Sequence, residues 1–361
     1  MPLGMPKTAI IGGGIIGTSI AWRLAQGGAA VTLYEKAQIG GEASWAAAGM
    51  LSPGGEISDD TREPELLIES RNLYRVFVQE LMEASGEAID YQECGAIDLA
   101  YSTAEWDALL QQAALHKRLG IKNRPLTPAQ INVFSPHAEG SRVVGALFYP
   151  DDGVVAPRDL MKALRKACEN ERVELRENAP VDRIQIQGDG VTIAGERYSN
   201  AVLAAGAWSG NVQIEGAPPV PSCEPVRGHL LAYDLQLGAC PTILRHGHIY
   251  VFQRGNGLVV AGASMERAGF ERQIDRTIVR DLIRKVADTM PLLARLEPID
   301  VWTGFRPASE HLQLGRWQQT PLFLAYGHYR NGILLAPVTA RRIADEIFGA
   351  NVGARQARTV G

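Results

Sequence analysis

Thr8-Ala-Ile-Ile-Gly-Gly-Gly-Ile-Ile-Gly-Thr-Ser-Ile-Ala-Trp-Arg-Leu-Ala-Gln26 is the stretch that decides the fold of this chain. Its first residues favour a β-strand, and from Ile15 onward the apolar residues recur with helical spacing. Between these parts, Gly12, Gly14 and Gly17 follow the G-x-G-x-x-G pattern. The first glycine permits a tight turn, the second lets the backbone approach a pyrophosphate, and the third lets the helix pack closely on its strand. The stretch therefore predicts a strand, turn and helix that bind an adenine dinucleotide.

A second apolar run, Ala30-Val-Thr-Leu-Tyr-Glu35, favours this interpretation over a glycine turn that binds nothing. The run is typical of a buried strand, and its terminal carboxylate follows the glycines by about twenty residues, where an acidic side chain bonds the ribose hydroxyls. A carboxylate at this place disfavours the 2′-phosphate of NADP, so we expect an unphosphorylated dinucleotide.

The composition is that of a globular chain long enough for two domains, with 361 residues, 46% of them hydrophobic and 21% charged. A net charge of −4 shows no basic excess, which argues against nucleic acid and anionic membrane surfaces as partners. No secretory signal and no apolar span of membrane length is found, so we expect a cytoplasmic protein. The four cysteines have no metal-ligand spacing, and we expect reduced thiols and no metal site.

The segment Gly40 to Gly55 is rich in small residues, which suits close approach of the backbone to a flat ligand. A flexible linker is the alternative, but Trp45, Met50 and Leu51 are poor linker residues. Farther along, Asn200 to Ser209 is a fully apolar run that is typical of a strand inside a parallel sheet. The chain is therefore expected to return there to the nucleotide-binding part.

Strand-like stretches follow one another from Val226 to Ala263 and are separated by turns that contain glycine. This pattern indicates an antiparallel sheet. Near the end, Leu322 to Ala325 is predicted as a strand and Ala340 to Phe348 as a helix, and the tail from Asn351 is expected to fray.

Several short motifs, in a fixed order, support a resemblance that spans nearly the whole chain. They are Ile11-Gly-Gly-Gly-Ile-Ile-Gly17, Ser44-Trp-Ala-Ala-Ala-Gly-Met-Leu51, Ala204-Ala-Gly-Ala-Trp-Ser209, His248-Ile-Tyr250, Gly304-Phe-Arg-Pro307 and Gly327-His-Tyr-Arg-Asn-Gly-Ile-Leu-Leu-Ala-Pro337. With these motifs the chain resembles the D-amino-acid oxidase superfamily of flavoproteins, and within it the thiamine-biosynthesis type of glycine oxidase. The resemblance implies that the cofactor is FAD rather than NAD.

The resemblance also implies an α/β fold with two domains. The first is a discontinuous Rossmann-like FAD-binding domain, a parallel sheet flanked by helices, built from residues 1–88, 150–218 and 318–361. The second is an α+β substrate domain with a large antiparallel sheet, built from residues 89–149 and 219–317.

The resemblance assigns cofactor contacts position by position, from the pyrophosphate turn to the far edge of the isoalloxazine ring. For the last of these an independent argument exists, since a strand that ends in glycine before a helix points backbone N–H groups at an electron-rich ring edge. The expected contacts are Gly12, Gly14, Ile15, Ile16, Gly17, Glu35, Lys36, Ala43, Ser44, Ala48, Gly49, Met50, Val181, Gly206, His328, Tyr329, Arg330, Asn331, Gly332, Ile333 and Leu334.

On the substrate side, Arg306 resembles the family's bidentate carboxylate clamp. Tyr250 resembles its hydroxyl partner, and Arg330 resembles a second arginine that contacts substrate. Without the resemblance, Arg306 is equally well explained as a surface ion-pair partner. For Tyr250, an ordinary strand aromatic is the less favoured alternative. His248 and Met265 are further candidates for the same cavity, although a strand histidine and a core methionine are more often structural.

The activity implied is FAD-dependent oxidation of glycine and other small amino acids, and the type of glycine oxidase that the chain resembles suggests a role in thiazole synthesis, which the sequence leaves open. Hydride transfer from the substrate α-carbon to flavin N5 would give an imino acid, and the reduced flavin would return its electrons to oxygen, giving peroxide. Water would then hydrolyse the released imine to an oxo acid and ammonia. Relatives that bind flavin covalently use a cysteine near the clamp, and 303–309 has none, so we expect non-covalent FAD. Two alternatives stay open: a D-amino-acid or sarcosine dehydrogenase with another electron acceptor, and a non-catalytic flavin-binding subunit. The sequence also leaves a homo-oligomer open.

Overall fold

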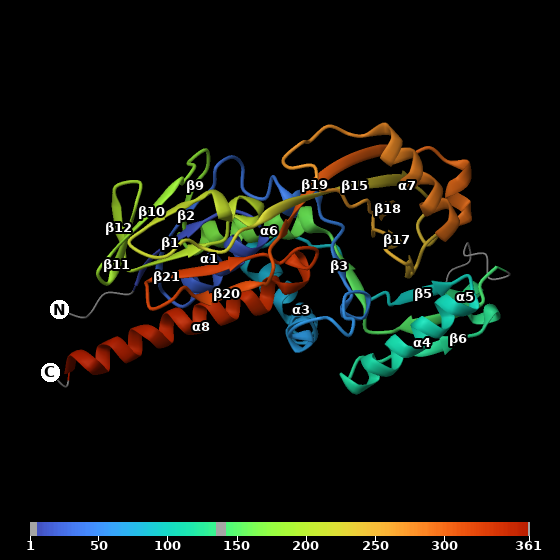
Figure 1. The fold of residues 1–361 in the computed structure, drawn as a ribbon, viewed down its shortest axis with the longest axis horizontal. Helices are drawn as coiled ribbons and strands as arrows, with labels where there is room; N and C mark the ends of the chain where they lie inside the picture. Colours follow the sequence, from blue (N-terminus) through green and yellow to red (C-terminus); the bar gives the residue numbers. More distant parts are fainter. Residues whose placement is uncertain (1–5, 135–141, 360–361) are drawn as a thin grey trace.

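The computed structural model describes residues 6–134 and 142–359 of the chain. Two large sheets lie toward opposite ends of the long axis of the molecule (Figure 1). A small three-stranded sheet adds to them, formed by β3 (Met50–Leu51), β8 (Gly153–Val155) and β4 (Tyr91–Gln92).

The first large sheet is six-stranded, in the order β20-β21-β13-β1-β2-β9. All neighbouring strands are parallel except the terminal pair β20 and β21. Strand β20 adjoins the predicted domain boundary at residue 318, and the boundaries themselves stay a prediction. The strands are β1 (Lys7–Ile11), β2 (Ala30–Tyr34), β9 (Glu174–Arg176), β13 (Asn200–Leu203), β20 (Gln313–Arg316) and β21 (Leu322–Tyr326).

The two faces of this sheet are covered differently. Alternating side chains of β1 show the arrangement, because Ile10 packs in a core cluster with Ile20 and Leu24 of a helix, whereas Ala9 packs with Ile184 of a second sheet. The helical layer consists of α1 (Ile15–Gln26), α3 (Pro64–Ser85), α6 (Pro157–Asn170) and α8 (Gly332–Thr359), which contact one another. The opposite layer is the four-stranded sheet of β10 (Arg183–Gln187), β11 (Gly190–Ile193), β12 (Glu196–Tyr198) and β14 (Gln213–Glu215).

The second large sheet is eight-stranded, in the order β19-β15-β18-β17-β16-β5-β7-β6, and all its neighbours are antiparallel except β16 and β5. Helix α7 (Arg276–Thr289) packs on it through Leu282 and Val286. Its strands are β5 (Ala96–Ala100), β6 (Arg124–Leu126), β7 (Gly145–Tyr149), β15 (Glu224–Asp234), β16 (Ile243–His246), β17 (Ile249–Gln253), β18 (Leu258–Gly262) and β19 (Asp300–Ala308).

The remaining described helices are short or lie outside these layers. They are α2 (Ala43–Ala46), α4 (Thr103–Arg118) and α5 (Pro128–Phe134), with the 3₁₀ turns η1 (Pro53–Gly55), η2 (Gly206–Asn211) and η3 (Pro291–Arg295).

The glycine turn between β1 and α1 has the predicted form, and the helix predicted from Ile15 to Gln26 is confirmed. Gly12 has a φ of 110°, and a Cβ on it would lie 2.4 Å from the carbonyl oxygen of Ala204. A Cβ on Gly17 would lie 1.9 Å from the carbonyl oxygen of Gly12. Both distances are shorter than any van der Waals contact, so the approach of α1 to β1 and β13 requires glycine at these positions.

The expected bounds of the last helix were wrong, because α8 begins at Gly332 and continues through Pro337 instead of starting at Ala340. A proline removes the N–H that would bond to the carbonyl of Ile333, four residues earlier. Helix α3 compensates for the loss, since the Tyr74 hydroxyl donates to Ile333 O at 3.0 Å and the Ser70 hydroxyl donates to Leu334 O at 2.6 Å. This repair comes from a distant part of the chain, and local sequence does not reveal it. The tail from 351 stays in this helix as far as Thr359.

Within the described ranges, no helix is both long and apolar enough to cross a membrane. The same residues contain no group of three or more histidine, cysteine or acidic side chains that could hold a metal ion.

Gly17→Ala is expected to destabilise the protein by about 1–3 kcal/mol, because the added methyl meets the backbone of the glycine turn. The matched control is Gly349→Ala, at an exposed helical glycine whose Cβ would meet no atom within 4 Å. Helix propensity predicts that this control gains up to about 1 kcal/mol. Thermal unfolding followed by circular dichroism measures both variants, and equal midpoints would contradict the close packing at Gly17.

Candidate active site

A cavity of about 630 Å³ extends between the glycine turn and the eight-stranded sheet. Its volume is in the range of cofactor and small-molecule sites. One end is lined by backbone of the six-stranded sheet and its loops, and the other end by side chains of β15, β17 and β19. The predicted residues that line it are Gly12, Gly14, Ile15, Ile16, Glu35, Lys36, Ala43, Ser44, Ala48, Gly49, Met50, Val181, Gly206, His248, Tyr250, Met265, Arg306, His328, Tyr329, Arg330, Asn331, Gly332 and Ile333.

Two of the expected contacts do not line the cavity. Gly17 lies behind the turn and serves the packing of α1. Leu334 is buried in the core between α8 and its neighbours. The loop 40–55, expected to line a ligand, contributes ten residues to the cavity wall: Glu42, Ala43, Ser44, Ala46, Ala47, Ala48, Gly49, Met50, Ser52 and Gly55.

The Glu35 carboxylate organises the nucleotide end of the cavity. One oxygen accepts the backbone N–H of Gly13 at 2.8 Å, and the other accepts that of Ala37 at 2.9 Å. Both bonds hold the carboxylate at the end of β2, where it lines the cavity. A carboxylate oxygen has more than one acceptor site, so ribose hydroxyls can donate to the same group.

Ser44 lies at the N-terminus of α1, where its hydroxyl oxygen accepts the backbone N–H of Ile15 at 2.8 Å. Since the oxygen is the acceptor in this bond, the hydroxyl proton is available to an acceptor in the cavity. The N-terminus of α1 adds the positive end of its dipole. This combination suits the pyrophosphate of a dinucleotide.

The turn from β21 to α8 forms another part of the cavity wall. Gly327 has a φ of 82° and Tyr329 a φ of 50°, which reverses the chain before α8 begins at Gly332. The first N–H groups of a helix have no partner within it, and Gly332 and Ile333 line the cavity. His328 is buried against the Thr339 hydroxyl at 3.0 Å, and burial lowers its pKa to about 3, so it is neutral.

Arg306 projects from β19 into the cavity and lies over Gly228 of the neighbouring strand. A Cβ on Gly228 would lie 2.3 Å from Arg306 Nη1, so glycine makes room for the guanidinium. Nη1 donates to the carbonyl of Ser264 at 3.0 Å and to that of Arg227 at 3.4 Å. Among the described residues, no carboxylate forms an ion pair with Arg306, which leaves Nε and Nη2 for an anion.

Tyr250, on β17, lines the same cavity as Arg306. Burial raises the pKa of Tyr250 to about 12, so its hydroxyl keeps its proton at neutral pH and acts as a donor. A guanidinium and a hydroxyl that both donate provide the chemistry that binds a carboxylate. His248 also lines the cavity, and burial lowers its pKa.

Arg330 has a partner that the sequence did not indicate. Its Nε and Nη2 donate to the Glu56 carboxylate at 3.1 and 2.9 Å, and both residues line the cavity. Arg330 is therefore neutralised by Glu56 in this structure, in contrast to Arg306. The only sequence signal for Glu56 was its place at the end of the small-residue loop.

Two further contacts were also missed. Lys36 Nζ lies 3.2 Å from the centre of the Trp208 ring, at the nucleotide end of the cavity. Arg254 is buried and donates to the carbonyls of Ala48 and Val155, which fixes the loop that forms the cavity wall. Burial lowers the pKa of Arg254 to about 10. Nothing in the local sequence distinguishes Arg254 from a surface arginine at the end of a strand.

The glycine turn, the parallel sheet and the cavity that they border are those of a dinucleotide-binding enzyme. The residues present fit FAD, since backbone N–H groups face both ends of the site and the glycine turn leaves no room for a Cβ. The chain belongs to the FAD dependent oxidoreductase family, whose model matches residues 7–346. It is therefore an FAD-dependent oxidoreductase.

Individual relatives agree with this assignment. A glycine oxidase of Bacillus licheniformis is 31% identical over 349 residues, which cover 95% of this chain and 93% of that protein. The bifunctional protein ThiO/ThiG of a Synechocystis species is 31% identical over 95% of this chain, and the match covers 52% of that protein. The crystal structure of glycine oxidase from Geobacillus kaustophilus has a TM-score of 0.88 and 30% identity, with 95% of each chain covered.

Glu35→Ala is expected to weaken FAD binding about 10- to 100-fold, because it removes charge-assisted hydrogen bonds at the turn. Titration of the apoprotein with FAD, followed by flavin fluorescence, measures the dissociation constant. Glu69→Ala is the control, since Glu69 pairs with Arg342 outside the cavity. A dissociation constant equal to that of the parent would show that Glu35 has no part in binding FAD.

Proposed function

We propose that this chain oxidises glycine and other small amino acids to the corresponding imino acids. The observation that carries the proposal is Arg306, a guanidinium beside Tyr250 that has no carboxylate partner among the described residues. The names of the glycine oxidase relatives support the substrate class.

In this proposal Arg306 Nε and Nη2 bind the substrate carboxylate, and the Tyr250 hydroxyl donates a further hydrogen bond to it. When bound, FAD supplies the chemistry by accepting a hydride from the substrate α-carbon. The two side chains fix the position of that carbon, which is the main contribution a protein makes to such a reaction. No side-chain base is required if the substrate binds as the free amine. His328, in the turn from β21 to α8, is kept neutral by burial.

The neutral Glu56–Arg330 pair bears on the charge of the substrate that the cavity accepts. The pair leaves a single free guanidinium in the described part of the cavity wall, matched to an amino acid with one carboxylate. We propose that FAD is held non-covalently, since no described cysteine lines the cavity. Oxygen as acceptor, a role in thiazole synthesis and a cytoplasmic location belong to the same proposal.

The direct test is anaerobic reduction of the flavin by glycine, sarcosine and D-alanine, followed by measurement of peroxide in air. Bleaching with peroxide release supports the oxidase. Bleaching without peroxide would identify a dehydrogenase that uses another acceptor. A flavin that none of these substrates reduces would refute the proposal and favour a non-catalytic subunit.

Arg306→Ala is expected to raise the KM for glycine by about 10- to 100-fold, because hydrogen bonds to a charged partner contribute about 1.5–3 kcal/mol. FAD content should stay that of the parent, since Arg306 lies at the substrate end of the cavity. Arg267→Ala is the control, at an exposed arginine that pairs with Glu224. Steady-state kinetics decide, and an unchanged KM in the Arg306 variant would place the carboxylate site elsewhere.

A further inference from the structure

The ion pair between Glu56 and Arg330 lies in the cavity wall, beside the two residues that the proposed function uses. Arg330 Nε and Nη2 both donate to the same oxygen, Glu56 Oε2, at 3.1 and 2.9 Å. The Glu56 side chain is 16% exposed and the Arg330 side chain 35%. The carboxylate is therefore the more buried member of the pair, and it cancels a positive charge that would otherwise face the cavity.

The backbone around Glu56 is held by bonds to other parts of the chain. The Glu56 N–H donates to the Pro53 carbonyl at 3.0 Å, within the turn η1. The next carbonyl, that of Ile57, accepts from the Gln112 amide and from Nε2 of the buried His116, each at 3.0 Å. These bonds give the Glu56 carboxylate a fixed place in the cavity wall.

Arg330 is brought close to Arg306 by the turn that precedes α8. The N–H of Tyr329 donates to the carbonyl of Pro307 at 3.0 Å. Tyr329 directly precedes Arg330, and Pro307 directly follows Arg306. Both guanidiniums are thus presented to the same end of the cavity, where a ligand with two carboxylates can contact both.

Tyr250 lies near both arginines and near Glu56. Burial raises the pKa of its hydroxyl to about 12, the charges of Arg306 and Arg330 act against this rise, and that of Glu56 adds to it. Charges shift a pKa in this way when they lie nearby. The substrate end of the cavity is therefore bordered by one unpaired guanidinium, one paired guanidinium and one fixed carboxylate.

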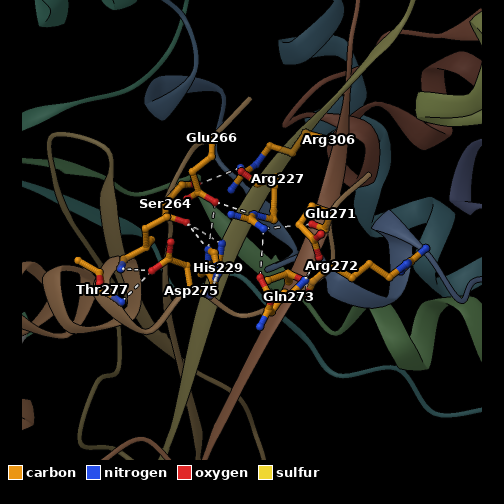
Figure 2. A network of polar contacts seen from close by, with 12 residues as sticks. Arg227, His229, Ser264, Glu266, Glu271, Arg272, Gln273, Asp275, Thr277 and Arg306 are labelled. Atoms are coloured by element: carbon orange, nitrogen blue, oxygen red, sulfur yellow. Dashed lines mark hydrogen bonds and ion pairs between the residues drawn. The ribbon is translucent and has the colours of Figure 1, made fainter. Parts of the chain in front are cut away.

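Another carboxylate near Arg306, that of Glu266, belongs to a separate polar network (Figure 2). It bonds Arg227 Nε at 2.9 Å and lies 3.2 Å from His229 Nδ1. Arg227 and His229 flank Gly228 on β15, and successive side chains of a strand point to opposite faces of the sheet. Since Gly228 lies under the Arg306 guanidinium, Glu266 is on the other face. This network therefore leaves Arg306 free on the cavity side.

We propose that Glu56 is a specificity-determining residue that excludes ligands with two carboxylates, because it occupies Arg330. The inference rests on the proposed function and narrows its substrate class to amino acids with one carboxylate. A second carboxylate that approaches Arg330 meets a guanidinium that is already paired, together with the negative charge of Glu56. Selectivity of this kind comes from a repulsive group in the site as well as from favourable contacts.

Acetate, malonate and succinate are suitable non-reacting probes, since they carry one carboxylate or two at different separations. Their dissociation constants are read at pH 8 from perturbation of the flavin absorption spectrum of the FAD-loaded full chain. The quantity compared is the dissociation constant of acetate divided by that of the dicarboxylate. In the parent this ratio should be about 1 or lower, and a parent that binds either dicarboxylate at least about tenfold more tightly than acetate would overturn the proposal.

Glu56→Gln is expected to raise this ratio about 10- to 100-fold for at least one dicarboxylate, because the freed guanidinium forms charge-assisted hydrogen bonds with the second carboxylate. Glutamine keeps the length and shape of the side chain and removes its charge. Glu80→Gln is the matched control, since Glu80 pairs with Arg23 outside the cavity. Ratios in Glu56→Gln equal to those of the parent for both dicarboxylates would refute the assignment.

Two further variants separate the charge of Glu56 from mere support of the loop. Glu56→Asp keeps the charge and should stay closer to the parent ratio than Glu56→Gln does. Combining Glu56→Gln with Arg330→Gln should abolish the gain, because the second guanidinium is then missing. An aspartate variant with the full gain, or a double variant that keeps it, would show that Glu56 does not act through its charge on Arg330.

Arg330→Gln alone decides the question if Glu56→Gln does not retain FAD. It leaves the Glu56 carboxylate uncompensated, so the ratio should fall below that of the parent, and a ratio equal to or above the parent value would contradict the proposal. If the parent binds acetate but oxidises no amino acid, only the proposed function fails. If the parent oxidises glycine and the ratios do not change, only this inference fails. If the FAD-loaded parent does not bind acetate, this inference fails together with the carboxylate site.

Discussion

The structure depends on one close backbone approach, where the carbonyl oxygen of Gly12 meets the first turn of α1 at Gly17 and the end of β13 presses against Gly12. A methyl group at either glycine would overlap a carbonyl. Because nothing projects between these segments, the N-terminus of α1 lies at the edge of the parallel sheet and points its N–H groups into the cavity. The position of the whole cofactor site follows from this contact.

The nucleotide half and the substrate half of the cavity differ in the groups that would bind a ligand. The nucleotide half relies on backbone N–H groups and on a carboxylate, Glu35, which is itself fixed by two N–H groups. The substrate half relies on side chains from the eight-stranded sheet. The halves are tied together by direct bonds, since Trp302 of β19 donates its indole N–H to Ala46 O at 3.0 Å. A Cβ on Gly304 would lie 2.5 Å from that of Ala46, so the second sheet is packed onto the loop that borders the cavity.

Sequence predicted those features that are encoded locally. The β1–α1 cradle, the acidic end of β2 and the small residues of 40–55 each have a local physical cause, and each contributes residues to the cavity wall. The features that the sequence did not predict are contacts between residues far apart in the chain. The early start of α8 needs hydroxyls from α3, the neutralisation of Arg330 needs Glu56, and the two bonds of Arg254 need carbonyls of remote loops. No spacing rule in a single chain reports such pairs, because the partners are brought together only by the folded sheets.

The hydroxyls of α3 that bond the carbonyls near Pro337 make the sequence of α8 depend on that of α3. Pro337 leaves the carbonyl of Ile333 without its helical donor, and the hydroxyls of Tyr74 and Ser70 occupy this part of α8. A chain that lost the Tyr74 hydroxyl while it kept Pro337 would bury the Ile333 carbonyl without a donor. Loss of that hydroxyl is therefore expected to be tolerated only in a chain whose residue 337 is no longer proline, whereas a non-proline residue at 337 is compatible with Tyr74.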